Sequence, residues 1–317
     1  MTFSQVNLVP NGSFEEYNWC PNTIDGYYID ACKYWKAPTL GTSDYFNTCS
    51  SESSPSSGEL LFSVPSNYIG YQFPKTGNAY AGFAYTESSD TSFVGNSSYS
   101  EYIRVQLNNT LEKGKLYKLR FYISNVDSTR CGNSIGAYFT SEDLFVSNDN
   151  NLEVIPDYQS DLSVFFCDYL NWIEQEYLFI SNGTEQFLTI GVFTRLYESK
   201  TSDYFGNIIS GPNQYGALQY LYIDDVSIEE CDLLVPNVFT PNNDGVNDEF
   251  KINGLSNRFS VAIINRWGEK VFQTDKPAIE YWDGNSKMNN CSEGVYYYVI
   301  GDKKNDFKKT GFVQLIR

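Results

Sequence analysis

The sequence predicts an all-β protein, with an N-terminal jelly-roll β-sandwich followed by a small Ig-like β-sandwich. Aromatic residues make up 17% of the 317 residues, with 26 Tyr and 22 Phe, and such side chains favour pleated, half-buried strands. Short apolar runs alternate with turn residues along the chain, as expected for successive strands. No segment keeps an amphipathic helical period for more than about three turns. The chain is long enough for two ordinary domains.

Strand patterns recur through the first two thirds of the chain, at spacings that suit a β-sandwich. Residues 48–58 are rich in Ser and have no apolar period, so they predict a surface loop. The clearest expected strands are short runs of aliphatic and aromatic residues, at 101–107, 115–124, 187–193 and 221–228.

A domain boundary is expected at residues 229–232, where one strand ends in Glu-Glu-Cys-Asp and another begins. The remaining 86 residues are sufficient for a small sandwich. Their pattern is a series of hairpins, with strands at 259–265, 270–273, 294–300 and 310–316. We therefore predict two domains, residues 1–231 and residues 232–317.

The excess negative charge lies entirely in the first domain. Residues 232–317 contain 11 Lys and Arg and 11 Asp and Glu, so the net charge of −17 belongs to residues 1–231. Such a field repels a phosphate backbone, which excludes nucleic acid as an expected partner. The longest apolar runs are far shorter than the roughly 18 residues of a membrane helix, so a membrane-spanning protein is not predicted.

Seven cysteines without a C-x-x-C pair favour disulfides over a metal site. The first residues lack the charged and apolar regions of a secretory signal peptide. Together these observations predict an exported protein whose signal peptide has been removed. Spacing favours the pairs Cys20–Cys32 and Cys231–Cys291, which leaves two partners and one spare among Cys49, Cys131 and Cys167.

No catalytic residue is predicted, because the chain contains no histidine. That absence removes Ser-His-Asp and Cys-His catalysis and histidine metal ligands. Residues 132–136 match the string G-x-S-x-G, but without a histidine or a following helix the match is a coincidence. A glycosidase needs only two facing carboxylates, so this enzyme class remains the alternative to a non-enzymatic protein.

Two segments raise the question of calcium. Residues 242–248 are rich in Asn and Asp, but they lack the ligand spacing and flanking helices of an EF-hand. We therefore expect their side chains to cap their own turns, with Gly245 at positive φ. Glu15 and Asp224 lie on the first and last expected strands of the first domain, which sandwich folds often pair. They are candidate ligands of a structural Ca²⁺, and hydrogen-bonded strand ends are the alternative.

A cluster of aromatic residues lies within the first fifty positions. Exposed aromatic rings stack on sugars while polar side chains bond the hydroxyls, so the cluster makes glycan a candidate ligand. The alternative is that these rings form part of the core. The residues are Trp19, Tyr34, Trp35, Tyr45 and Phe46.

Five motifs follow one another in the second domain, at residues 235–248, 264–268, 282–284, 294–298 and 315–317. Together they resemble the gliding-motility-associated C-terminal domain of Bacteroidota, the type B signal of the type IX secretion system. The resemblance implies a small β-sandwich that is recognised in the periplasm after Sec export. It also implies passage through the outer-membrane translocon with the help of a shuttle barrel. The residues implied for this secretion signal are Pro236, Asn237, Phe239, Thr240, Pro241, Asn242, Asp244, Gly245, Asn247, Asp248, Asn265, Arg266, Trp267, Gly268, Trp282, Asp283 and Gly284.

The first domain carries weaker similarities. Residues 11–15 and 222–227 resemble galactose-binding-like jelly rolls of the carbohydrate-binding-module type. Residues 44–47, 77–82 and 101–103 resemble an N-terminal domain common in exported Bacteroidota proteins.

These resemblances imply a non-enzymatic protein of the cell surface or the extracellular space, linked to gliding motility or adhesion, with glycan as a candidate ligand. The alternative function is an accessory component of the secretion or motility apparatus that stays docked on the translocon.

Overall fold

The computed structural model describes residues 6–87, 99–126, 129, 131–193, 217–253, 255, 258–286, 289–303 and 307–317. Across these ranges the regular structure is one short 3₁₀ helix, η1 (Ile29–Ala31), and strands β1 to β16. The all-β prediction is therefore confirmed. The helix contains only three residues, in keeping with a sequence that shows no sustained helical period.

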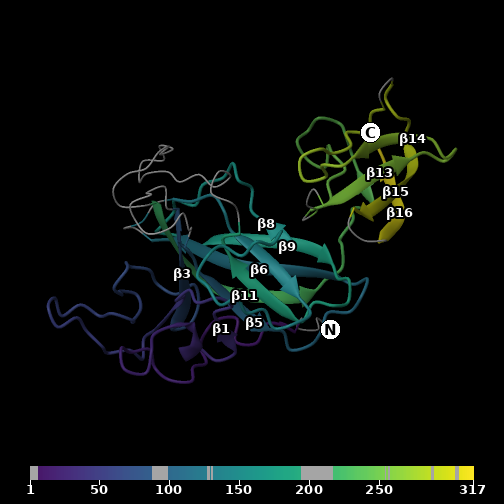
Figure 1. Ribbon diagram of the computed structural model, residues 1–317. Helices are drawn as coiled ribbons and strands as arrows, with labels where there is room; N and C mark the ends of the chain where they lie inside the picture. Colours follow the sequence, from purple (N-terminus) through teal and green to yellow (C-terminus); the bar gives the residue numbers. More distant parts are fainter. Residues whose placement is uncertain are drawn as a thin grey trace. The chain divides into compact units, whose positions relative to one another are not determined.

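The chain forms two compact units (Figure 1). The first contains Met1–Leu111, Leu119–Gln175 and Thr184–Glu229. The second contains Glu230–Arg317 together with Glu112–Lys118 and Glu176–Gly183.

Strands β1 to β11, most of whose residues belong to the first unit, form two sheets. One has the strand order β1-β5-β10-β7-β8, and the other β2-β3-β11-β6-β9, with β4 paired to β3. The expected strands at 101–107, 115–124, 187–193 and 221–228 are β5, β6, β10 and part of β11. The bounds of the eleven strands are β1 (Trp35–Lys36), β2 (Asp44–Asn47), β3 (Ala79–Glu87), β4 (Tyr99–Ser100), β5 (Tyr102–Gln106), β6 (Leu116–Asn125), β7 (Gly136–Thr140), β8 (Tyr158–Gln159), β9 (Ile173–Ile180), β10 (Phe187–Gly191) and β11 (Ala217–Glu230).

Aromatic side chains fill much of the first unit's core. Phe46, Tyr80 and Tyr222 are fully buried, and the Tyr80 and Tyr222 ring centroids lie 4.7 Å apart. Their hydroxyls are also used, because Asn67 donates to Tyr80 Oη and Tyr222 Oη donates to Asn67. A buried tyrosine whose hydroxyl has a partner keeps its apolar contribution without the cost of an unsatisfied polar group.

The second unit contains one five-stranded sheet with the order β12-β16-β15-β13-β14. The short strand β12 runs parallel to β16, and the other pairs are antiparallel. Residues of the connecting loops share one hydrophobic core with the sheet, and two of them, Phe250 and Trp282, form an isolated bridge. The strands are β12 (Val238–Phe239), β13 (Phe259–Ile264), β14 (Lys270–Thr274), β15 (Gly294–Asp302) and β16 (Lys308–Leu315).

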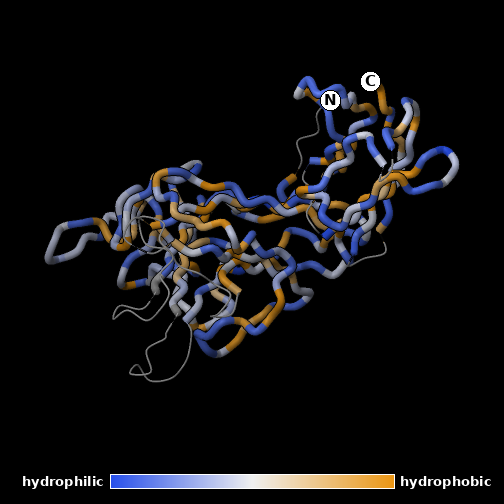
Figure 2. The backbone as a smooth tube through the Cα atoms, turned by 90° about the horizontal axis from the view of Figure 1, so that it is seen from above, coloured by the Kyte–Doolittle hydropathy of each residue, from blue (hydrophilic) through white to orange (hydrophobic). Residues whose placement is uncertain are grey.

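Burial along β13, β15 and β16 alternates with period two, as a half-buried sheet requires. Along β13, Phe259, Val261 and Ile263 are buried, while the residues between them are partly exposed. Figure 2 shows hydrophilic and hydrophobic stretches following one another along the backbone. The buried residues of the sheet, which include Phe239 of β12, share one hydrophobic core with Trp282 and Phe250.

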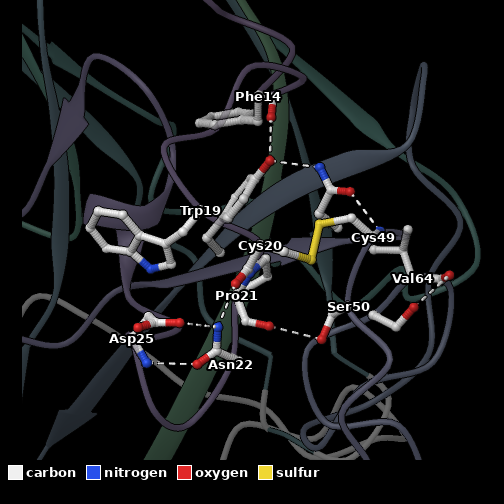
Figure 3. The surroundings of a disulfide bond; sticks show 12 residues. Phe14, Trp19, Cys20, Pro21, Asn22, Asp25, Cys49, Ser50 and Val64 are labelled. Carbon is white, nitrogen blue, oxygen red and sulfur yellow. Dashed lines mark hydrogen bonds between the residues drawn. A yellow bond between two sulfur atoms is a disulfide. The ribbon is translucent and has the colours of Figure 1, made fainter.

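Disulfides form as expected, but the predicted pairs Cys20–Cys32 and Cys231–Cys291 were wrong. Cys20 pairs with Cys49 (Figure 3) and Cys131 pairs with Cys167, at Cα–Cα distances of 5.9 and 4.7 Å. Cys32 is instead a buried thiol within 3.2 Å of Asn11 Nδ2, and the predicted pair Cys231–Cys291 does not form. Spacing along the chain misled here, because a disulfide depends on which Cα atoms the fold brings within about 4.4–6.8 Å.

Hydrogen bonds organise the segment beside the Cys20–Cys49 bond. Cys49 N donates to Asn47 Oδ1, and Asn47 Nδ2 donates to the Tyr45 hydroxyl, which donates to Phe14 O. On the Cys20 side, Ser50 Oγ donates to Pro21 O (Figure 3). The bond therefore joins two irregular segments whose polar groups are satisfied locally.

In the described ranges, no helix has the length and apolar character needed to cross a membrane.

Candidate functional site

The Asx-rich corner that follows β12 is held by its own side chains. Asp248 accepts hydrogen bonds from the backbone N–H groups of Asn243 and Gly245, at 2.6 and 2.8 Å. Asp244 Oδ1 accepts one from Val246 N at 2.8 Å. Gly245 has φ of 86°, as predicted. The corner is a set of Asx turns, so its carboxylates serve the backbone.

Trp282 packs against Phe239, which precedes this corner, and pairs with Phe250, which follows it. Its side chain is fully buried, its ring lies 5.0 Å from that of Phe239 and 4.8 Å from that of Tyr296, and Nε1 donates to Asn285 O at 2.8 Å. The next residue, Asp283, caps the turn by accepting from Asn285 N at 2.9 Å.

Gly284 allows the closest approach in this region. It has φ of 80°, and a Cβ there would lie 2.9 Å from Leu315 Cδ1 and 3.0 Å from Pro241 Cγ. The Arg317 guanidinium donates to the carbonyl oxygens of Gly284 and Cys291. A side chain at position 284 would therefore push apart three of the sequence motifs.

The motif at residues 265–268 forms the β13–β14 turn. Asn265 Oδ1 accepts from Trp267 N and Glu269 N at 3.0 and 2.9 Å, and Gly268 has φ of 84°. Trp267 is 70% exposed, with the Arg266 guanidinium 4.4 Å from its ring centroid. The two tryptophans of the predicted secretion signal thus have opposite environments.

Strand pairing places the motifs at one end of the sheet. β12 ends at Phe239, which pairs with Leu315 near the end of β16, and Leu315 also pairs with Gly294, where β15 begins. The end of β13 pairs with the same part of β15, through Ile264 and Tyr297. A cavity of about 610 Å³ lies among these segments. Predicted signal residues in its lining are Pro236, Phe239, Pro241, Gly245, Asn247, Asp248 and Asp283.

In the first unit, Glu15 and Asp224 converge on one loop. Asp224 Oδ2 accepts from the backbone N–H groups of Lys75 and Thr76 at 2.8 and 3.3 Å, and Glu15 Oε1 accepts from Asn78 N at 2.7 Å. Gly77 lies between, where a Cβ would come within 2.2 Å of Glu15 Oε1. Burial and the neighbouring Asp225 charge raise the pKa of Asp224 to about 8, against the opposing effect of its N–H donors.

This arrangement supplies carboxylate oxygens, which Ca²⁺ accepts as ligands, and a complete site has about six to eight oxygen ligands from carboxylates, carbonyls and water. Among the described residues no group of three or more His, Cys, Asp or Glu is placed to hold a metal ion. The geometry accounts for both carboxylates through hydrogen bonds to the loop. Ca²⁺ therefore remains a proposal, with Glu15 and Asp224 as its carboxylate ligands.

The calcium proposal predicts that Ca²⁺ raises the melting temperature of the full chain relative to chelator. A ligand that binds only the folded state, at a concentration 100 times its dissociation constant, raises the free energy of unfolding by about 2.7 kcal/mol. Glu15→Gln and Asp224→Asn should each remove the shift, while Asp161→Asn, at an exposed Asp, should preserve it. Equal melting curves with Ca²⁺, Mg²⁺ and chelator would leave the hydrogen-bonded loop as the whole explanation.

A groove of about 430 Å³ lies on one face of the β1-β5-β10-β7-β8 sheet. Lys36, Arg104 and Thr189 lie in one cross-strand row of this face, and Gln106 pairs with Phe187 in the next. The segment before β8 covers the neighbouring part of the face, because Leu144, Val146 and Leu152 pack around Tyr102. Side chains lining the groove include Tyr34, Lys36, Arg104, Gln106, Asp143 and Phe187.

Two aromatic rings and a buried cation define the groove. The Arg104 side chain is 6% exposed, pairs with Asp143, donates to Leu144 O, and lies 5.8 Å from the Phe187 ring centroid. Tyr34 is 52% exposed and has φ of 72°. A non-glycine residue with this left-handed backbone conformation costs about 1–3 kcal/mol of conformational strain, and such residues cluster at ligand sites.

The structure separates the aromatic residues near the start of the chain. Trp35, Tyr45 and Phe46 are buried, so the core interpretation holds for these three. Tyr34 alone of the five lines the groove. Trp19 is half-buried, and its Nε1 donates to Gly26 O. Phe187, the second groove aromatic, carried no distinguishing signal because its position in a strand gives no information on which face it occupies.

A pair of carboxyl groups is buried elsewhere in the first unit. Asp44 on β2 accepts from the hydroxyls of Tyr68 and Tyr220. Glu101 accepts from Ala84 N at 2.6 Å and from Tyr99 Oη. Burial, and then the charge of Glu101, raises the pKa of Asp44 to about 8, and burial also raises the pKa of Glu101.

The described lining of the groove does not contain the pair of carboxylates that a glycosidase would use. A glycosidase needs two carboxylates flanking the bond to be cleaved, and the described residues lining the groove include one, Asp143, which is paired with Arg104. The G-x-S-x-G string fails as a nucleophile turn, because Ser134 is fully buried and Gly136 begins β7.

Residues 233–315 match the CHU_C type IX secretion signal domain family. The match confirms the resemblance found in the second domain. A type IX secretion signal directs export to the cell surface or the extracellular space and implies contact with the secretion machinery. The comparison with curated proteins finds no match.

Several solved structures match this chain at low similarity. The chain is 12% identical to the K1 cleaved adhesin domain of Lys-gingipain from Porphyromonas gingivalis W83, covering 63% of this chain and 92% of that one at a TM-score of 0.28. A CBM4 structure is 10% identical, and the match covers 70% of this chain and 99% of that chain at a TM-score of 0.30. Tailspike protein 4 of bacteriophage CBA120 is 11% identical, with 71% of this chain and 21% of that chain covered at 0.32. TM-scores this low carry no argument about function.

Proposed function

We propose that this protein is a non-enzymatic, glycan-binding protein that type IX secretion delivers to the cell surface or beyond, where it acts in adhesion or gliding. The second unit supplies the export signal through residues 233–315. The first unit supplies the binding function through the groove on its β1-β5-β10-β7-β8 sheet.

The observation that carries the glycan proposal is the combination of Tyr34, Phe187 and Arg104 in one groove. Aromatic rings supply stacking surfaces for sugar rings, and a few polar groups fix orientation. Lys36, Arg104 and Gln106 provide hydrogen-bond donors along adjacent strands. The groove lining contains two cations and one carboxylate, although the net charge of residues 1–231 is −17. It therefore suits neutral or anionic sugars.

Glycan binding is tested with the full chain on a panel of neutral and acidic polysaccharides, followed by titration calorimetry with those that bind. Tyr34→Ala and Phe187→Ala should each weaken binding about tenfold, equivalent to roughly 1.4 kcal/mol. The control is Tyr71→Ala with Phe73→Ala, an exposed aromatic pair outside the groove lining. Equal losses in the groove and control variants would reject this site, as would binding to none of the polysaccharides.

The alternative, an accessory part of the secretion or motility apparatus, makes a different prediction for the same chain. After export it would remain with outer-membrane barrels in stoichiometric amount, and the groove variants would leave that association unchanged.

A further inference from the structure

The outer face of the second unit's sheet carries an exposed apolar row. Ile264 of β13 pairs with Tyr297 of β15, and Tyr297 pairs with Phe312 of β16. Directly paired residues place their side chains on the same face, about 4.5–5.5 Å apart at Cβ. Tyr297 is 50% exposed and Phe312 is 56% exposed. The row therefore crosses three strands, and its two aromatic rings are exposed on the outer face of the sheet.

The rows on either side continue this uncharged surface. On one side, Gln314 pairs with both Val238 and Val295, which are 42% and 46% exposed. On the other side, Val299 pairs with Ala262 and Thr310. We call these three rows the apolar sheet face: Val238, Ala262, Ile264, Val295, Tyr297, Val299, Thr310, Phe312 and Gln314. None of these nine residues is charged, although residues 232–317 contain 22 charged residues, and Lys270 of β14, which also pairs with Ile264, lies at one edge of the face.

The polar motif residues offer a poorer recognition surface. The carboxylates of Asp248 and Asp283 and the amide of Asn265 are used in turns of their own segments. Trp282 is buried and Gly284 is enclosed by neighbouring atoms. These residues build the end of the sheet. A single exposed apolar side chain is ordinary, whereas a contiguous exposed row marks an interaction site.

We propose that the apolar sheet face docks on an uncharged, apolar surface of a protein of the type IX secretion machinery. This inference rests on the export role of the second unit. The partner surface is expected to be apolar because the nine residues of the apolar sheet face carry no charge that could form an ion pair with it. A stable protein interface uses about 20–30 residues a side, so a face of nine residues suits the brief docking of an exported cargo better than a permanent dimer.

The test compares export of the full chain, preceded by a Sec signal peptide, in a bacterium that has the type IX system. Tyr297→Ser with Phe312→Ser should lower the ratio of extracellular to periplasmic protein by about tenfold or more, equivalent to roughly 1.4 kcal/mol of docking energy. The matched control is Ile279→Ser with Tyr71→Ser, an exposed aliphatic and an exposed aromatic residue elsewhere. Urea unfolding of the purified variants checks that both remain folded.

A second measurement identifies the occupant. A photoreactive amino acid at position 312 should crosslink to a component of the secretion machinery, identified by mass spectrometry, and one at position 279 should not. Export of the folded double variant at the wild-type level overturns the docking face. Crosslinks to a second copy of this chain alone, or to lipid alone, also overturn it. Wild-type export that does not need the translocon would instead overturn the export role itself.

Discussion

Replacing Trp282 with Ala is expected to lower the free energy of unfolding of the second unit by about 3–5 kcal/mol. The side chain is fully buried, packs between Phe239 and Tyr296, and donates from Nε1 to Asn285 O. Its removal leaves a cavity and an unpaired carbonyl where the motif segments meet. Urea unfolding of the full chain, followed by circular dichroism and analysed as two transitions, measures the loss.

Trp267→Ala is the matched control, because it removes the other tryptophan of the secretion signal from an exposed turn. A surface substitution of this kind usually changes stability by no more than about 0.5 kcal/mol. Similar losses for the two variants would contradict the division between a buried anchor and an exposed turn. The exposed ring contacts the Arg266 guanidinium, so its removal is expected to affect that side chain rather than the core.

The first unit is expected to lose stability as pH rises from 5 to 8. The folded-state pKa of Asp44 is raised to about 8, from 3.8. A carboxyl group with a raised folded-state pKa contributes most below its unfolded pKa, and its contribution is lost as pH rises towards the folded value. At about 1.4 kcal/mol per pH unit, the loss over this interval is of the order of 4 kcal/mol. The buried carboxyls Glu101 and Asp224, whose pKa values are also raised, act in the same direction.

Asp44→Asn isolates this effect, because the amide keeps an acceptor for Tyr68 and Tyr220 and does not titrate. Urea unfolding at several pH values should give a flatter dependence on pH for the variant than for the wild type. Asp161→Asn, at an exposed carboxylate, should keep the wild-type dependence between pH 5 and 8. The same dependence in the wild type and Asp44→Asn would show that Asp44 does not titrate in this range.

The strands of the first unit could be predicted because their pattern is local. Residues 101–107, 115–124, 187–193 and 221–228 contain enough aliphatic and aromatic residues to define strands without knowledge of their partners. The turns at Gly245 and Gly268 were equally accessible, since Asx side chains and positive φ are properties of a few adjacent residues. The all-β class and the motifs of the secretion signal follow from such patterns.

The groove needed information that no short segment contains. Phe187 and Gln106 share a face because β10 pairs with β5 in one register, and a shift by a single residue would move Phe187 to the core. Trp35 and Tyr34 are adjacent in the sequence, yet one is buried and the other lines the groove. Aromatic composition predicted stacking surfaces but could not select the residues that form them.

The disulfides show the same division. The sequence alone indicated that cysteines pair, through their number and the absence of a C-x-x-C motif. The partners depended on the fold, which brings Cys20 to Cys49 across 29 positions and Cys131 to Cys167 across 36.

By itself, the sequence determined the class of structure, the main strands, the local turns and the secretion-signal motifs, because backbone propensity and the alternation of side chains act over a few residues. Only the tertiary structure decided the disulfide partners, the groove, the burial of Asp44 and the exposure of Tyr297 and Phe312. Those features depend on strand order and register, which bring together residues that are distant in the chain.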